Sequence, residues 1–156
     1  KNMKKILFSL FVSTLLLGGS CVLSTPQNPI ASGDKLDLSN QQLTKVPESV
    51  FKQTNLVELN PSNNQLTGAL PGEIRQLRKL KILKANDNLM TGVPAEIGQL
   101  QNLEILDLSD NQLTGLPNEL GNLKNLKTLD ISGNDYSTLD LKTITERLPS
   151  NVNIIK

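Results

Sequence analysis

The chain lacks histidine and tryptophan entirely, and it has one cysteine among its 156 residues. Without histidine it cannot form the Ser-His or Cys-His pairs of common hydrolases, or a metal site built on imidazole. A single cysteine excludes a disulfide within the chain, so packing alone must stabilise the fold. Aromatic residues make up 3% of the sequence, which leaves few side chains for stacking on bases or sugars. These absences argue against the commonest enzyme classes.

Excess charge of either sign is also missing, since 16 Lys and Arg residues stand against 15 Asp and Glu residues. A nucleic-acid binder needs a basic stripe or patch to neutralise phosphates, and no such cluster stands out in the sequence. We therefore expect no nucleic-acid partner. Leucine, by contrast, fills 30 positions and asparagine 17, a bias that suggests an internal repeat.

The N-terminal residues are typical of an export signal. Lys4 and Lys5 precede an uncharged, mainly apolar run over residues 6–17, and Gly18, Gly19 and Ser20 follow it. This run is too short for a helix that crosses a bilayer, which needs about 20 apolar residues. We expect residues 1–20 to be a signal peptide. Its removal takes away three lysines and no acids, which leaves a net charge of 13 − 15 = −2.

The segment Leu17-Gly18-Gly19-Ser20-Cys21 resembles the lipobox of bacterial lipoproteins. In that family the cysteine becomes the first residue of the mature chain and is lipidated. The resemblance implies a lipid anchor at Cys21, a tether over residues 21–32, and a place in the cell envelope facing outside the cytoplasm. Gly18 departs from the aliphatic residue that the family prefers, and the same bond suits ordinary signal peptidase. A secreted form therefore remains the alternative.

A unit of 23 or 24 residues recurs through the rest of the chain, and its copies begin at Gly33, Leu56, Leu80, Leu103 and Leu126. Within a unit such as Leu103 to Leu108, the alternation of leucines points two side chains inward from a short strand. Strands stacked in parallel about 4.8 Å apart would bury a continuous core and line the concave side of a solenoid. In the first four units, Val-Pro or Leu-Pro follows the strand and precedes a segment with apolar residues three apart, which predicts short helical or 3₁₀ segments on the convex side.

The pattern L-x-x-L-x-L-x-x-N-x-L is the leucine-rich-repeat signature, and residues 33–148 resemble bacterial members of that family. The resemblance implies an α/β solenoid, the leucine-rich-repeat horseshoe. Residues 66–71, Leu-Thr-Gly-Ala-Leu-Pro, are also similar to the linker of plant-type repeats. At the C-terminal end, the spacing of Leu141, Ile144 and Leu148 predicts one helix over the open core. Residues 149–156 should complete this cap, with Ile154 and Ile155 in a final strand.

Two features inside the units have structural interpretations. One asparagine falls eight residues after each unit's start, where its amide can bond to backbone groups that a tight turn leaves unpaired. This predicted structural ladder comprises Asn64, Asn88, Asn111 and Asn134, with Gln41 in the first unit. Pro61 occupies an inward strand position and has no N–H for the sheet, so we expect the second unit to be locally weak.

The candidate ligand site lies at the outward positions of the strands. Ile82 and Ile105 form an adjacent apolar pair, and charged residues flank them. The predicted concave-face site comprises Ile82, Lys84, Ile105, Asp107, Thr128 and Asp130. Beyond the strands, a small polar ridge is expected at Ser39, Ser62, Asn86, Ser109 and Ser132, beside Asn40, Asn63, Asp87, Asp110 and Gly133.

Neighbouring strands would place Asp107 and Asp130 about 5 Å apart, near the separation found in retaining glycosidases. A smooth concave sheet offers no water-excluding cleft to raise one pKa, and no third group to orient the pair. A calcium site at Asp107, Asp110 and Asp130 is the alternative interpretation of these acidic residues. We expect no catalysis, no cofactor and no metal. The hypothesis is an exported, lipid-anchored module that binds a protein or peptide; a secreted effector-like binder and a passive spacer are the alternatives.

Overall fold

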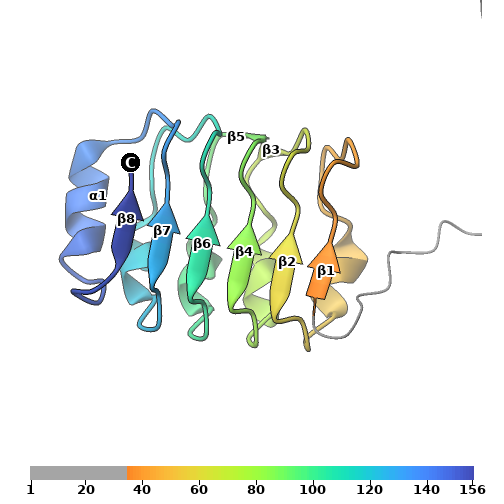
Figure 1. The fold of residues 1–156 in the computed structure, drawn as a ribbon, viewed down its shortest axis with the longest axis horizontal. Helices are drawn as coiled ribbons and strands as arrows, with labels where there is room; N and C mark the ends of the chain where they lie inside the picture. The colour runs from red at the N-terminus through yellow and green to blue at the C-terminus, as the bar shows by residue number, and fades with distance from the viewer. Residues whose placement is uncertain (1–34) are drawn as a thin grey trace, which may run out of the picture.

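The computed structural model describes residues 35–156, which wind into successive coils around one apolar core (Figure 1). Each coil contributes a three-residue strand to a six-stranded sheet in which every neighbouring pair is parallel. The strands, in sheet order, are β1 (Lys35–Asp37), β2 (Glu58–Asn60), β4 (Ile82–Lys84), β6 (Ile105–Asp107), β7 (Thr128–Asp130) and β8 (Asn153–Ile155). The predicted leucine-rich-repeat solenoid is confirmed. The signal peptide, Cys21 and the first residues of unit 1 lie outside the described residues.

The leucine alternation sets which side of the sheet is buried. The middle residue of each of the first five strands points inward and is at most 2% exposed; these are Leu36, Leu59, Leu83, Leu106 and Leu129. The residues on either side of it point outward, as a period of two requires. Because all copies share one register, like positions of successive units stand side by side across the sheet.

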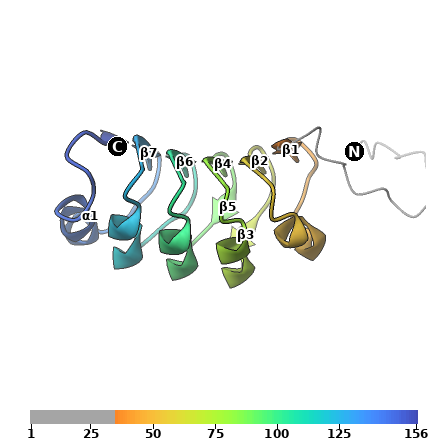
Figure 2. The same cartoon turned by 90° about the horizontal axis from the view of Figure 1, so that it is seen from below.

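On the other side of the core lie four short 3₁₀ helices, which Figure 2 shows below the row of strands. They are η1 (Glu48–Lys52), η2 (Gly72–Gln76), η3 (Ala95–Gln99) and η4 (Asn118–Asn122). A proline precedes each of them as the N-cap, in extended conformation. The expected helical turns are present, but proline stands one residue before the helix and not inside it. Since an N-cap keeps extended backbone angles, the fixed φ of proline suits this place equally well.

A true α-helix, α1 (Thr138–Thr145), covers the C-terminal end of the core. Ser137 caps it by accepting a hydrogen bond from the backbone N–H of Asp140. Leu141, Ile144 and Leu148 are buried against the last coil, as predicted, although Leu148 lies beyond the helix itself. The predicted final strand is β8, paired with β7. Among the described residues no helix has the length and apolar character needed to span a membrane.

The four ladder asparagines make the same set of hydrogen bonds in successive coils. In Asn111, for example, Nδ2 donates to the carbonyl oxygens of Ala85, Leu108 and Ser109 at 3.0–3.1 Å, and Oδ1 accepts from the backbone N–H of Met90 at 3.0 Å. Asn64, Asn88 and Asn134 repeat this pattern. Each amide thus connects one coil to the next and satisfies turn carbonyls that water cannot reach.

The second unit departs from the others in two ways. Pro61 leaves β2 and β4 with two paired positions, where every other pair in the large sheet has three. At the positions equivalent to Pro61, Leu38, Ala85 and Leu108 each donate a 2.8 Å backbone hydrogen bond to the next strand. The unit is also one residue longer, and its Thr67–Gly68 segment (β3) pairs with Leu89–Met90 (β5) in a separate two-stranded sheet. The repeat pattern did not lead us to expect this second sheet.

Candidate functional site on the concave face

The six candidate residues lie together on three neighbouring strands. Register pairs Ile82 with Ile105 and Ile105 with Thr128, and in the second outward column it pairs Lys84 with Asp107 and Asp107 with Asp130. All six are half-buried. Two parallel rows of three side chains therefore run across the middle of the concave face, one mainly apolar and one charged.

Ion pairs neutralise the N-terminal part of this face. Glu58 lies between two lysines, with Lys35 Nζ at 2.9 Å and Lys84 Nζ at 3.2 Å. The hydrogen bond from Lys35, followed by that from Lys84, outweighs partial burial and lowers the pKa of Glu58. Lys84 thus reaches toward the preceding strand and not across Ile82 and Ile105, so its charge is paired within the protein.

Asp37 and Asn60 form the start of the second outward column. Asn60 Nδ2 donates to Asp37 Oδ1 at 3.1 Å, and the backbone N–H of Ser39 donates to the same oxygen at 2.9 Å. This backbone hydrogen bond is the main reason why the pKa of Asp37 is lowered. The first two positions of the column are therefore occupied by bonds within the protein.

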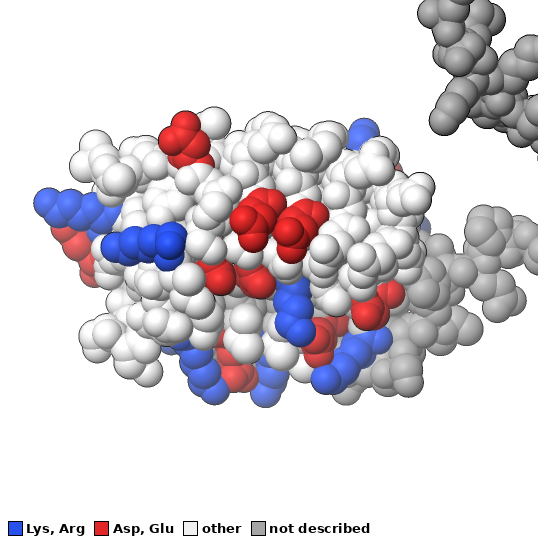
Figure 3. All heavy atoms as spheres, turned by 45° about the horizontal axis from the view of Figure 1, so that its top comes forward, with Lys and Arg blue, Asp and Glu red and all other residues white. Residues whose placement is uncertain are grey.

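The C-terminal part of the face keeps free acidic charge. Asp107 Oδ1 accepts from the backbone N–H and the hydroxyl of Ser109, at 3.1 and 2.7 Å, and Asp130 bonds to Ser132 in the same way. Each carboxylate retains its second oxygen, and neither takes part in an ion pair within residues 35–156. In Figure 3 acidic side chains stand close together near the middle of the molecule.

The polar ridge has a structural explanation that the sequence analysis missed. Ser62 and Ser109 are buried, and their hydroxyls donate to Asn60 and Asp107, so these members of the ridge serve as structural partners of the strand residues. The neighbouring column adopts positive φ in every unit, with values of 51–67° at Asn40, Asn63, Asp87, Asp110 and Gly133. Asn, Asp and Gly are the residues that tolerate this left-handed conformation, which accounts for their recurrence.

Two residues of the face were not among the candidates. Strand β8 extends both outward columns, since its register pairs Asn153 with Thr128 and Ile155 with Asp130. Ile155 is 40% exposed and adds an apolar side chain beside the free carboxylate of Asp130. The strand predicted at residues 154 and 155 is the sequence signal for these two positions, because a further strand in register extends both outward columns.

The acidic residues do not form a metal site in the described part of the chain, where no group of three or more Cys, Asp or Glu side chains is arranged to hold an ion. Asp107 and Asp130 are adjacent across the sheet, each tied to its own serine. This arrangement holds both carboxylates in place but provides no hydrogen bond between them and no enclosing cleft. What it can do chemically is present fixed negative charge beside an apolar row.

Comparison with known proteins identifies the family. A family model described as a leucine-rich repeat region matches residues 35–148. The chain belongs to the leucine-rich-repeat family. Leucine-rich-repeat domains are in general non-catalytic modules of protein–protein interaction. No curated protein sequence matches the chain.

Solved structures show the same fold. A leucine-rich-repeat protein of Leptospira interrogans is 38% identical over 74% of this chain, with a TM-score of 0.69, and the match covers 29% of that protein. A plant peptide hormone receptor, RGFR1 in complex with RGF2, is 36% identical over 78% of this chain and 20% of its own, with a TM-score of 0.64. A chain of the BIR3–SERK2 complex of Arabidopsis thaliana is 34% identical over 74% of this chain and 62% of its own, with a TM-score of 0.61. The chain therefore spans less than two thirds of each of these proteins.

Proposed function

We propose that this protein is an exported recognition module whose concave face binds a protein or peptide. The main support is the two aligned rows of outward side chains on β4, β6 and β7, where Ile82 and Ile105 lie beside Asp107 and Asp130. An apolar strip with a charged border is the usual anatomy of a protein interface. Support also comes from the relatives, among which one is a receptor solved with a peptide hormone and another is a protein complex.

The fixed geometry of these side chains favours recognition further. Hydrogen bonds from Ser109 and Ser132 hold the two carboxylates in one orientation before any partner arrives. A surface that is already ordered loses less side-chain entropy on binding. The remaining carboxylate oxygens would accept hydrogen bonds from a partner, while Ile82, Ile105 and Ile155 would contact its apolar side chains.

The test is cross-linking and mass spectrometry on whole cells. The test variant carries Lys84→Glu, Asp107→Lys and Asp130→Lys. The control variant carries Lys45→Glu, Glu73→Lys and Glu119→Lys, which reverse the same charges at exposed positions away from the concave face. We expect wild type and control to capture a partner that the folded test variant loses. Equal capture by all three would overturn the site, and capture of no specific partner by any of them would favour a passive spacer.

We further propose that Cys21 carries a lipid and tethers the module to the cell envelope. The support is the lipobox-like segment over residues 17–21 and the absence of any other cysteine. A Cys21→Ser variant should leave the membrane fraction and appear in the soluble or secreted fraction, and only the wild type should incorporate a labelled fatty acid. If the wild type incorporates none, or the variant stays in the membrane, the anchor is wrong and the secreted form stands.

A further inference from the structure

A depression of the surface lies on the convex side, away from the concave face. It has a volume of about 600 Å³ and is lined by residues of the first three units. Three of these are cations, Arg75, Arg78 and Lys79, and none is an acid. The remaining lining residues are Thr54, Asn55, Gln76 and Gln99. Every side chain in the wall can therefore donate a hydrogen bond. The Glu96 carboxylate lies close to Arg75, since both stand against Gly72, but no ion pair joins them within the described residues.

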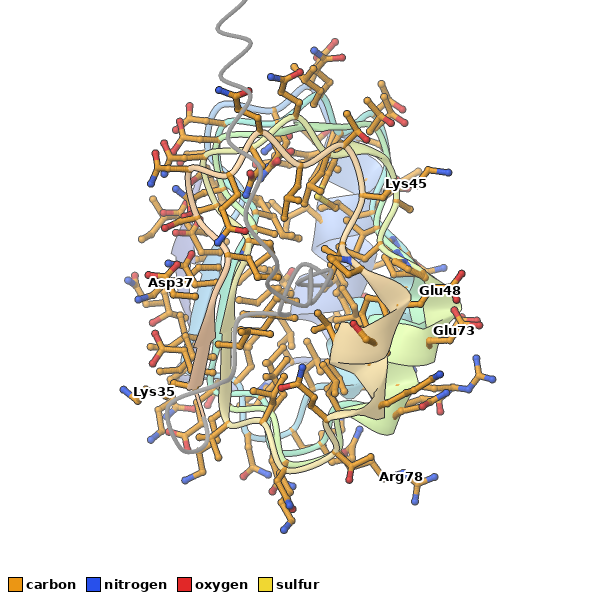
Figure 4. The ribbon with its side chains drawn as sticks, turned by 90° about the vertical axis from the view of Figure 1, so that its right-hand side faces the viewer. Lys35, Asp37, Lys45, Glu48, Glu73 and Arg78 are labelled. Atoms are coloured by element: carbon orange, nitrogen blue, oxygen red, sulfur yellow. The ribbon has the colours of Figure 1, made fainter. Side chains whose placement is uncertain are left out.

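The three cations remain available to a ligand. None of them takes part in an ion pair within the described residues. Arg75 Nη1 donates to the carbonyl oxygen of Gly72 at 3.2 Å, and Lys79 Nζ donates to Asn55 Oδ1 at 2.8 Å. These bonds hold the two side chains in place without neutralising them, and they leave the Asn55 amide group free to donate. In Figure 4 Arg78 projects outward at the lower edge, on the side opposite Lys35 and Asp37.

These residues are exceptions to the repeat. Arg75 stands where the next two units have Gly98 and Gly121, and Lys79 stands where they have Asn102 and Asn125. The asparagines are structural, because Nδ2 of Asn102 donates to the carbonyl oxygen of Arg78 and Nδ2 of Asn125 to that of Gln101. Lys79 gives up the equivalent backbone bond and gains only the side-chain bond to Asn55. Residues that depart from the repeat without an evident compensating gain are expected at functional positions.

We propose that this depression is an anion site that takes phosphate groups. Arginine presents a planar fork of donors that matches phosphate oxygens, and lysine adds a point charge. Three cations favour a multiply charged ligand over a single carboxylate. Phosphate groups of this kind are carried by soluble diphosphate compounds and by lipid headgroups.

The test compares two variants of the full chain, each of which loses three positive charges at different positions. The test variant carries Arg75→Gln, Arg78→Gln and Lys79→Asn, the last of which restores the asparagine of the repeat. The control carries Lys45→Gln, Lys142→Gln and Lys156→Gln, at exposed positions outside the depression. All proteins also carry Cys21→Ser, and circular dichroism checks that each is folded. Any binding through residues 1–34 is common to all of them and cancels in the comparison.

Two probes distinguish the sources of phosphate. Calorimetry measures binding of inorganic pyrophosphate at about 50 mM salt, where screening is weak. Sedimentation measures binding to vesicles of phosphatidylglycerol, with phosphatidylcholine vesicles as the reference. For at least one probe, we expect the test variant to bind about tenfold more weakly or worse, and the control to stay within about twofold of the parent.

The outcomes divide clearly. Pyrophosphate binding alone identifies a soluble phosphate compound, and vesicle binding alone identifies a lipid headgroup. Amide shifts of Thr54 and Asn55 on addition of the effective probe would support the site in either case. The proposal is overturned if neither probe binds, or if test and control variants weaken binding equally.

Discussion

The side-chain amide of Asn88 donates to the carbonyl oxygen of Pro61, 3.1 Å away in the preceding coil. The same Nδ2 donates to the carbonyl oxygens of Ala85 and Asn86, and Oδ1 accepts from the backbone N–H of Leu66. Pro61 has no N–H of its own to pair with β4, so this bond, which the ladder asparagines repeat between successive coils, is one of the links that remain between the second and third coils. It also fixes the turn that follows β4, directly beside the concave face.

Asn88→Ala should destabilise the domain strongly. The substitution removes the partners of three carbonyl oxygens and one N–H in a buried turn, and we expect a loss of about 3 kcal/mol or more in the free energy of unfolding. Asn86→Ala is the control, because the Asn86 amide bonds only to the exposed side chain of Asp87. Urea unfolding followed by circular dichroism measures both. Equal midpoints for the two variants would mean that the ladder contributes little.

Pro61→Leu should strengthen the second unit. Leucine occupies the equivalent position in units 1 and 4, and its N–H can donate to the next strand as Leu38 and Leu108 do. One added backbone hydrogen bond predicts a gain of about 1 kcal/mol. Hydrogen exchange should show new protection of the amide at position 61 and slower exchange in β2 and β4. Unchanged protection in β2 would show that proline is not the cause of the weak pairing.

Gly98→Ala should cost stability, whereas Gly92→Ala should be nearly neutral. A Cβ at Gly98 would collide with the backbone carbonyl of Glu119 in η4, so the two helices would have to separate. Overpacking of this kind typically costs about 1–3 kcal/mol. At Gly92 the nearest heavy atom to an added Cβ is 3.9 Å away, which is ordinary contact. Thermal unfolding of both variants tests the expected order, and the reverse order would rule out tight helix packing at Gly98.

Stability should depend on pH through Glu58. Its pKa is below the ordinary value of 4.5 in the folded state, so its contribution is present above that pH and is lost as the pH falls through the lowered pKa. Lys35 is exposed and Lys84 is half-buried, so water screens both ion pairs and the contribution at neutral pH should stay under about 1 kcal/mol. The difference in unfolding free energy between wild type and Glu58→Gln should therefore shrink on acidification. For Glu48→Gln, which removes an exposed acid on η1, no comparable loss is expected. A wild-type advantage over Glu58→Gln that persists below the lowered pKa would contradict this assignment.

The sequence was sufficient to predict the sheet and much of the concave face. A fixed repeat length places like positions side by side, so the alignment of Ile82 with Ile105 and of Asp107 with Asp130 follows from counting. Partner choice was not predictable in this way. Lys84 can reach either neighbouring strand, and only the folded structure shows that it turns to Glu58.

The convex side was less predictable, because it depends on single residues that break the repeat. The position that faces the next helix is glycine in units 3 and 4, but it is Phe51 in unit 1 and Arg75 in unit 2. Phe51 lines a hollow of about 480 Å³ beside Ala69, near the extra residue of the 24-residue unit. Repeat periodicity contains no information about such local differences in packing.

The most direct test of concave-face recognition is site-specific photo-cross-linking in living cells. A photoreactive residue replaces Thr128 on the concave face in one protein and Glu119 on η4 in another; the first is half-buried among the candidate residues and the second is exposed on the convex side. We expect a discrete cross-linked species from position 128 that is absent from position 119 and disappears when Asp107 and Asp130 are reversed to lysine. The same species from both positions, or a species only from position 119, would contradict it.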